Sequence, residues 1–121
     1  MIIAVDFDGT LCTNAFPDIG EITNKQQNVI DLIHYLHARG HTIILWTCRN
    51  DTEQRKYLTE AILWCSDHDI HIDYVNENTP EAIKVFRQDT RKVVADYYID
   101  DRAINLEEDM IMRLLIDMKG R

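Results

Sequence analysis

Acidic residues stand at the ends of two short apolar runs in this 121-residue sequence. Asp6 and Asp8 end the first run, and Asp100 and Asp101 directly follow the last run. Four carboxylates brought to one place cannot all stay ionised unless a cation neutralises them. Hard oxygen ligands favour magnesium, which completes its coordination shell with water and substrate phosphate. If the two runs form neighbouring strands, these four residues predict a Mg²⁺ site.

Three further residues carry groups that bind phosphate. Thr47, after an apolar run, offers a hydroxyl donor, and Lys92, just before the last run, offers a positive charge. Arg49 lies two residues beyond Thr47 and is a candidate contact for a phosphate or its leaving group, with a surface charge as the alternative. Together with the carboxylates, these residues predict a site for a small phosphorylated substrate.

The elements that must position these residues begin with strands. Nearly continuous apolar runs at residues 2–7 and 42–46 are typical of strands buried on both faces. Residues 70–75 alternate apolar and polar side chains, as a half-covered strand does, and residues 93–99 predict a fourth strand. Residues 10–22, by contrast, form a polar loop rich in turn-forming residues.

Amphipathic helices are expected between these strands and after the last of them. Apolar residues recur at helical spacing in four segments, and capping residues or a proline precede three of these segments. The predicted helix boundaries are marked by Thr23 with Gln26, Gly40, Asp51 with Gln54, Thr79 with Pro80, and Asn105.

This alternation of strand and helix predicts an α/β fold. Helical crossovers imply a doubly wound parallel sheet of about four strands, with helices on both faces. Ligands of such sheets bind beyond the carboxyl ends of the strands, where the carboxylates and Thr47 fall. The length favours one domain that spans residues 1–121.

Composition narrows the class of protein. The chain has 45% hydrophobic and 28% charged residues, which is typical of a globular domain. Its net charge of -8 would repel a phosphate backbone and argues against a nucleic-acid partner. No apolar run is long enough for a membrane span, and the apolar start lacks the basic leader of a signal peptide. Three widely spaced cysteines predict reduced thiols in a cytoplasmic protein.

One stretch resembles a known family motif. Residues 5–11, Val-Asp-Phe-Asp-Gly-Thr-Leu, resemble the first motif of the haloacid dehalogenase (HAD) superfamily of phosphatases. The second, third and fourth motifs of that superfamily are matched in order by Thr47, Lys92 and the pair Asp100-Asp101. The resemblance covers essentially the whole chain and implies a HAD-like core, in which the strands of the sheet have the order 4-1-2-3.

The resemblance implies a two-step phosphoryl transfer. Asp6 would be the nucleophile that forms an aspartyl phosphate, and Asp8 would act first as general acid and then as general base. Mg²⁺ would be held by the Asp6 side chain, the Asp8 carbonyl and Asp101, with Asp100 as the alternative to Asp101. Thr47 and a lysine would bind the phosphate.

The sequence leaves alternatives for two features: which residue is the lysine of the third motif, and which substrate is bound. Lys84 and Arg91 lie in the same segment as Lys92 and are alternatives to it. The segments where related enzymes insert a cap domain are too short for one here, so the chain resembles a capless member. Residues 95–102 resemble the matching stretch of 5′(3′)-deoxyribonucleotidases, which favours a nucleotide, and sugar phosphates are the other candidate class. Phe16 is a candidate to stack on a base or sugar, with packing against the domain as the alternative.

Two further expectations concern association and rival functions. The last strand is apolar and would lie at a sheet edge, so pairing between copies into a homo-oligomer is expected. The alternative functions are a phospho-accepting receiver-like module and a catalytically inactive HAD-like subunit. In a receiver domain, however, the acidic pair precedes the phospho-acceptor, and here the order is reversed.

Overall fold

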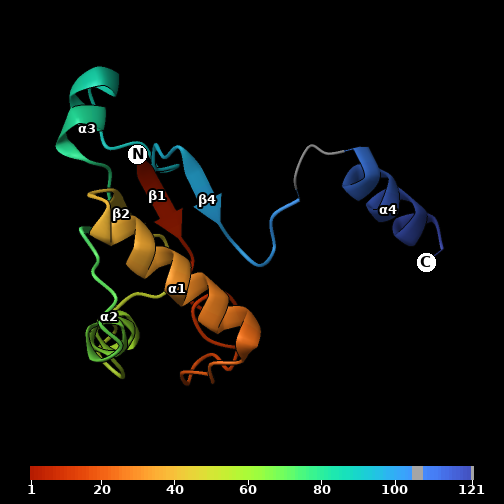
Figure 1. The fold of residues 1–121 in the computed structure, drawn as a ribbon, viewed down its shortest axis with the longest axis horizontal. Helices are drawn as coiled ribbons and strands as arrows, with labels where there is room; N and C mark the ends of the chain where they lie inside the picture. Colours follow the sequence, from red (N-terminus) through yellow and green to blue (C-terminus); the bar gives the residue numbers. More distant parts are fainter. Residues whose placement is uncertain (105–107, 121) are drawn as a thin grey trace.

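The computed structural model describes residues 1–104 and 108–120, and within them strands and helices alternate as predicted (Figure 1). The predicted marker Asn105 lies outside the described residues. The elements are β1 (Ile2–Val5), α1 (Asn24–Ala38), β2 (Thr42–Leu45), α2 (Tyr57–Asp67), β3 (Tyr74–Val75), α3 (Pro80–Phe86), β4 (Tyr97–Ile99) and α4 (Glu108–Lys119).

The four strands form one parallel sheet in the order β3-β2-β1-β4. This is the predicted order, read from the opposite edge. In the register of the sheet, Val5 pairs with Leu45 on one side and with Ile99 on the other. The three strands therefore end level with one another, and the residues that follow them emerge at one edge of the sheet.

The main core lies between the sheet and the helices α1 and α2. Ile3 and Val5 of β1 pack there with Ile33 of α1 and Cys65 of α2, all of them almost fully buried. On the opposite face, a second cluster is built around Ala4, Ile44 and the buried Val93. The sequence predicts helices on both faces; in the described residues, the segment around Val93 packs on the second face instead.

The start of α1 agrees with the prediction from the sequence, and the start of α2 does not. The capping box of Thr23 and Gln26 is present, and the Thr23 amide donates to Gln26 Oε1 at 3.1 Å. The predicted start of α2 at Asp51 is wrong, because this helix begins at Tyr57. Asp51 still caps it from outside, since its carboxylate accepts a 2.9 Å bond from the Thr59 amide in the first turn.

All four strands are shorter than predicted, and the difference is largest for the third and the fourth. The third covers only Tyr74–Val75 of the predicted residues 70–75, and the fourth covers only Tyr97–Ile99 of the predicted residues 93–99. Val93 is 1% exposed although it lies outside the strand. Its apolar character therefore reports burial in the second cluster and not membership of a strand.

Two further predictions concern the cysteines and the membrane. Cys12 and Cys65 are free and buried, and Cys48 is free and exposed, as expected for reduced thiols. Among the described residues, no helix has the length and apolar character to cross a membrane.

The edge strand β4 carries exposed apolar surface. Tyr97 is 61% exposed, and both β4 tyrosines line an apolar groove of about 290 Å³ with Leu32 and Leu36 of α1. An uncovered apolar strand edge favours pairing with another chain. We therefore predict self-association through β4, seen as a concentration-dependent rise in mass during sedimentation.

A charge on the edge tests this prediction. Tyr97→Lys should shift the protein to a monomer, since a lysine on an edge strand opposes pairing. Val85→Lys is the matched control, because Val85 is 74% exposed on α3, away from β4. A wild-type protein that stays monomeric at every concentration would contradict the prediction.

Candidate functional site

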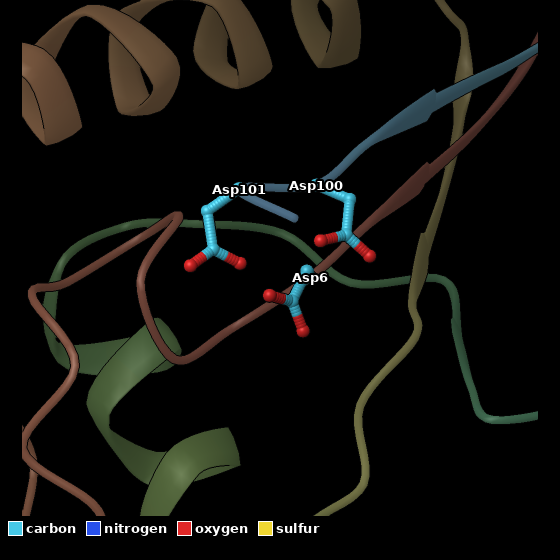
Figure 2. Close-up of side chains that lie close together, drawn as sticks. All are labelled: Asp6, Asp100 and Asp101. Atoms are coloured by element: carbon cyan, nitrogen blue, oxygen red, sulfur yellow. The ribbon is translucent and has the colours of Figure 1, made fainter. Parts of the chain in front are cut away.

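Three of the four predicted carboxylates converge at the edge where β1 and β4 end. Asp6 follows β1, and its amide donates to Ile99 O at 2.9 Å, which fixes its position beside β4. Asp100 and Asp101 follow β4, and carboxylate oxygens of all three residues lie within 4.8 Å of one another (Figure 2). Three carboxylate groups this close together could hold a divalent metal ion.

The electrostatics of Asp6 agree with a cation-binding cluster. Burial and the neighbouring Asp100 carboxylate raise the pKa of Asp6 from 3.8 to about 7. Asp101 contributes to this rise through a side-chain hydrogen bond and its charge. The cluster thus holds more negative charge than the protein neutralises by itself, which is the condition under which a cation is favoured.

Gly9 leaves space for the Asp101 carboxylate of the acidic cluster. Its φ is +88°, a left-handed conformation that glycine adopts without strain. A Cβ at this position would lie 2.2 Å from Asp101 Oδ2 and 2.6 Å from Asp101 Cγ. The absence of a side chain at Gly9 therefore lets the Asp101 carboxylate approach the loop that follows β1.

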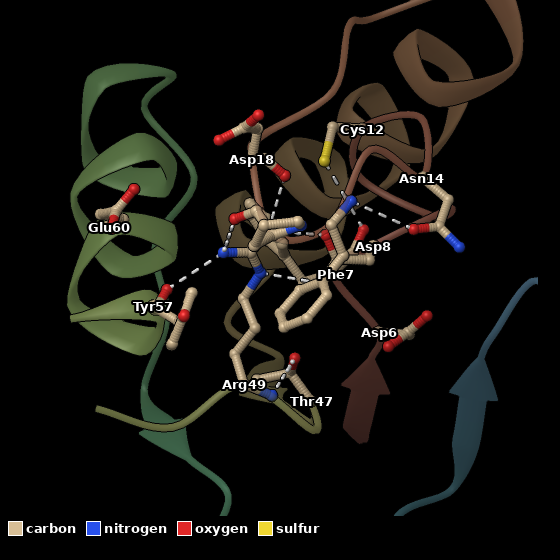
Figure 3. A network of polar contacts seen from close by, with 12 residues as sticks. Asp6, Phe7, Asp8, Cys12, Asn14, Asp18, Thr47, Arg49, Tyr57 and Glu60 are labelled. Atoms are coloured by element: carbon tan, nitrogen blue, oxygen red, sulfur yellow. Dashed lines mark hydrogen bonds and ion pairs between the residues drawn. The ribbon is translucent and has the colours of Figure 1, made fainter. Parts of the chain in front are cut away.

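Asp8 makes a different contact from the other carboxylates. Its two oxygens accept parallel hydrogen bonds of 2.8 Å from Arg49 Nε and Nη2 (Figure 3). The Arg49 side chain is 1% exposed and the Asp8 side chain 18% exposed. This bidentate ion pair fixes the orientation of the Asp8 carboxylate at the rim of the acidic cluster.

Arg49 also binds the loop that covers the site. Its remaining N–H groups donate to the carbonyls of Pro17, Asp18 and Tyr57, at 3.4, 2.9 and 3.3 Å. The guanidinium carbon lies 5.1 Å from the ring centroid of Phe16. The alternative of a surface charge is therefore wrong for Arg49, and its donors are occupied by protein acceptors.

Thr47 lies at the end of β2, as predicted, and is held by a loop on each side. Its amide donates to Asn76 Oδ1 at 2.8 Å, and its hydroxyl oxygen accepts a 3.1 Å bond from the Arg49 amide. Because the hydroxyl accepts this bond, its hydrogen is available to donate to a ligand.

The basic residues predicted for the third motif do not line the pocket over Asp6. Lys92 Nζ is 5.3 Å from the ring centroid of Tyr98, and both Lys84 and Arg91 are exposed. Among the described residues that line the pocket over Asp6, the basic ones are Arg49 and Arg102. Arg102 directly follows the Asp pair, and its amide donates to Asp100 Oδ1 at 2.8 Å.

The pocket has a volume of about 350 Å³ and joins the acidic cluster to the loop of residues 13–22. Phe16 is 55% exposed and lines it, although its ring also packs 5.6 Å from the Tyr57 ring. Both interpretations of Phe16 from the sequence thus have a structural basis. The lining residues are Asp6, Asp8, Asn14, Phe16, Cys48, Arg49, Asp100, Asp101 and Arg102.

Comparison with solved structures adds one relative. A conserved protein coded by a locus of Bacteroides thetaiotaomicron matches with 34% sequence identity and a TM-score of 0.69, over 98% of this chain and 91% of that chain. The chain belongs to the family of this Bacteroides protein. No family model and no curated protein matches the chain. The Bacteroides relative is described only as conserved, so the chemistry must be argued from the site.

Two features of the site were not predicted from the sequence of this relative of the Bacteroides protein. The first is that Arg102 lines the pocket. Its position in the sequence, directly after the acidic pair at a strand end, could have indicated this. The ion pair of Arg49 with Asp8 had no such signal, since the two residues are 41 positions apart and the chain between them contains a whole helix and a strand.

Proposed function

We propose that this protein is a magnesium-dependent phosphohydrolase of the HAD type, which cleaves a phosphate monoester through an aspartyl-phosphate intermediate. The observation that carries the proposal is the convergence of Asp6, Asp100 and Asp101 within 4.8 Å, beside the loop that begins with Asp8 and Gly9. The chain order of these residues matches the superfamily motifs that the sequence resembles.

In the first step, a carboxylate oxygen of Asp6 attacks the phosphorus of the substrate. The bond from phosphorus to the leaving oxygen breaks as the new bond forms, and Asp8 gives its proton to that oxygen. The chain would hold Mg²⁺ through the Asp6 side chain, the Asp8 carbonyl and Asp101, with Asp100 as the alternative, and the ion would supply charge neutralisation.

In the second step, water attacks the phosphorus of the aspartyl phosphate. Asp8, now ionised, accepts the proton of this water, and the bond between phosphorus and the Asp6 oxygen breaks. Inorganic phosphate leaves, and Asp6 and Asp8 return to their starting states. The bonds from Arg49 hold Asp8 at the pocket, and while Asp8 carries a proton, the protonated oxygen gives up its bond from Arg49.

The phosphate of the substrate would be bound by the Thr47 hydroxyl and by a cation. Arg102 lines the pocket and is the better candidate for that cation than Lys92, whose ammonium lies over Tyr98. A pocket of about 350 Å³ suits a small phosphomonoester such as a nucleotide or a sugar phosphate. The net charge of -8 opposes a polynucleotide substrate.

Phosphate release from a panel of nucleoside monophosphates and sugar phosphates tests the proposal. We expect turnover in Mg²⁺ and loss of turnover when a chelator removes the ion, with activity restored by added Mg²⁺. A phosphorylated DNA end should be a poor substrate. Turnover that persists in chelator would contradict the proposed chemistry. Stable phosphorylation without turnover would instead indicate a receiver-like module.

A further inference from the structure

Arg49 has a guanidinium whose whole donor capacity is used inside the protein. Two N–H groups bind the Asp8 carboxylate, two bind the carbonyls of Pro17 and Asp18 in the loop, and one binds the Tyr57 carbonyl at the start of α2. These five bonds account for all five N–H groups of an arginine. No donor is left for a substrate phosphate in this arrangement.

The surroundings of Arg49 explain why an arginine is needed. Its guanidinium carbon lies 5.1 Å from the Phe7 ring and 5.1 Å from the Phe16 ring, and the residue is only 2% exposed. A planar group with donors on every edge fits between two rings and reaches acceptors on three segments at once. A lysine has three donors from a single point and cannot make the same set of contacts.

We propose that Arg49 is a positioning residue that couples the loop of residues 13–22 to the proton-transfer geometry of Asp8. The loop can leave the pocket only if the bonds from Arg49 to Pro17 and Asp18 break, and the same guanidinium holds the Asp8 carboxylate. Movement of the loop and orientation of Asp8 are thereby linked through one buried side chain. The proton-transfer role of Asp8 rests on the proposed function; the mechanical link does not.

Substrates with different leaving groups separate positioning from a general structural effect. A nitrophenolate leaves without a proton, whereas an alkoxide needs one from Asp8. Arg49→Gln should lower kcat/KM about 100-fold for an alkyl phosphate, with only a small loss for p-nitrophenyl phosphate, because kcat/KM reports the step in which the leaving group departs and not the hydrolysis that both substrates share. Arg49→Lys should restore part of the activity, because a lysine keeps the charge but not the bidentate contact.

Arg55→Gln is the matched control. Arg55 also binds the loop, since its guanidinium lies 3.1 Å from Asp18 Oδ1 and pairs with Glu60, but within the described part of the chain it makes no hydrogen bond or ion pair with Asp8. This variant removes a loop contact and leaves the Asp8 pair intact. Its ratio of kcat/KM for the two substrates should therefore equal that of the wild type.

Hydrogen exchange of the loop amides gives a readout that does not need activity. Arg49→Gln and Asp8→Asn should both speed exchange at the amides of Thr13 and Asp18, which are bonded within the loop. Asp8→Asn is nearly isosteric, so it serves if Arg49→Gln does not fold. Reciprocal loosening of the loop by a change at Asp8 is what coupling requires.

Two results would overturn the inference. One is an equal loss of kcat/KM for both substrates in Arg49→Gln, matched by Arg55→Gln, which would indicate a structural role. The other is unchanged loop exchange in both Arg49→Gln and Asp8→Asn. If the wild type hydrolyses neither substrate, the proposed function fails, and the link between loop and Asp8 is then supported or overturned by the exchange data.

Discussion

Asp6→Asn should reduce turnover of the best substrate about a thousandfold or more, because an amide oxygen is a poor nucleophile toward phosphorus. The change removes one charge and keeps the shape of the side chain, so the fold should be preserved. Burial raises the pKa of Asp6 because it disfavours the charged carboxylate, and a neutral amide at this position removes that unfavourable desolvation energy. Steady-state release of phosphate in Mg²⁺ measures the effect.

Asp67→Asn is the control for this substitution. Asp67 is the exposed last residue of α2, so the same chemical change there should leave turnover unchanged. If Asp6→Asn retained most of the wild-type turnover, a mechanism through Asp6 would be contradicted, and water would have to attack the substrate directly.

Mg²⁺ should raise the melting temperature of the protein, and the rise should depend on pH. At an ion concentration 100-fold above Kd, binding stabilises the fold by about 2.7 kcal/mol, which for a domain of this size is roughly 10 °C. Scanning calorimetry with Mg²⁺ and with chelator measures the difference. This result does not depend on knowing the substrate.

The direction of the pH dependence follows from Asp6. Its folded pKa of about 7 lies above the ordinary value of 3.8, so protonation stabilises the metal-free fold fully below about 3.8, and this stability is lost as the pH rises through 7. The ion binds the ionised carboxylates. The rise in melting temperature should therefore be small at acidic pH and large above pH 7.

Single substitutions in the acidic pair identify the ligand. Asp101→Asn should remove most of the rise in melting temperature, and Asp100→Asn should remove less of it if Asp101 is the direct ligand. Asp67→Asn should keep the full rise. A rise of equal size in all three variants and in wild type would contradict an ion bound at the acidic cluster.

The parts of the fold that the sequence predicted are those with local signals. The alternation of elements and the junctions after β1, β2 and β4 could be read from apolar runs that end in polar residues, and the strand order followed from the family resemblance. Three of the four acidic residues meet because parallel strands in register end at one edge. Asp6, Asp100 and Asp101 were therefore accessible to sequence reasoning.

The parts that it could not predict depend on contacts between distant residues. Arg49 reaches Asp8, the loop and α2 through a side chain whose direction no local pattern records. The acidic side chain of Asp51 predicts a helix start there, because acidic residues often cap helices. In the structure α2 begins at Tyr57, five residues intervene, and the Asp51 carboxylate accepts a hydrogen bond from the Thr59 amide in the first turn. The sequence predicts Lys92 at the site, whereas in the structure its ammonium lies over the Tyr98 ring and Lys92 does not line the pocket.

The covalent intermediate is the claim that separates this account from other metal-dependent hydrolases. The direct measurement is an acid quench during turnover in Mg²⁺, followed by borohydride reduction and mass spectrometry of the peptides. The account predicts homoserine at position 6, the reduction product of an aspartyl phosphate, and unmodified peptide in Asp6→Asn. Turnover at full rate with no modification at Asp6 in the quenched protein would contradict it.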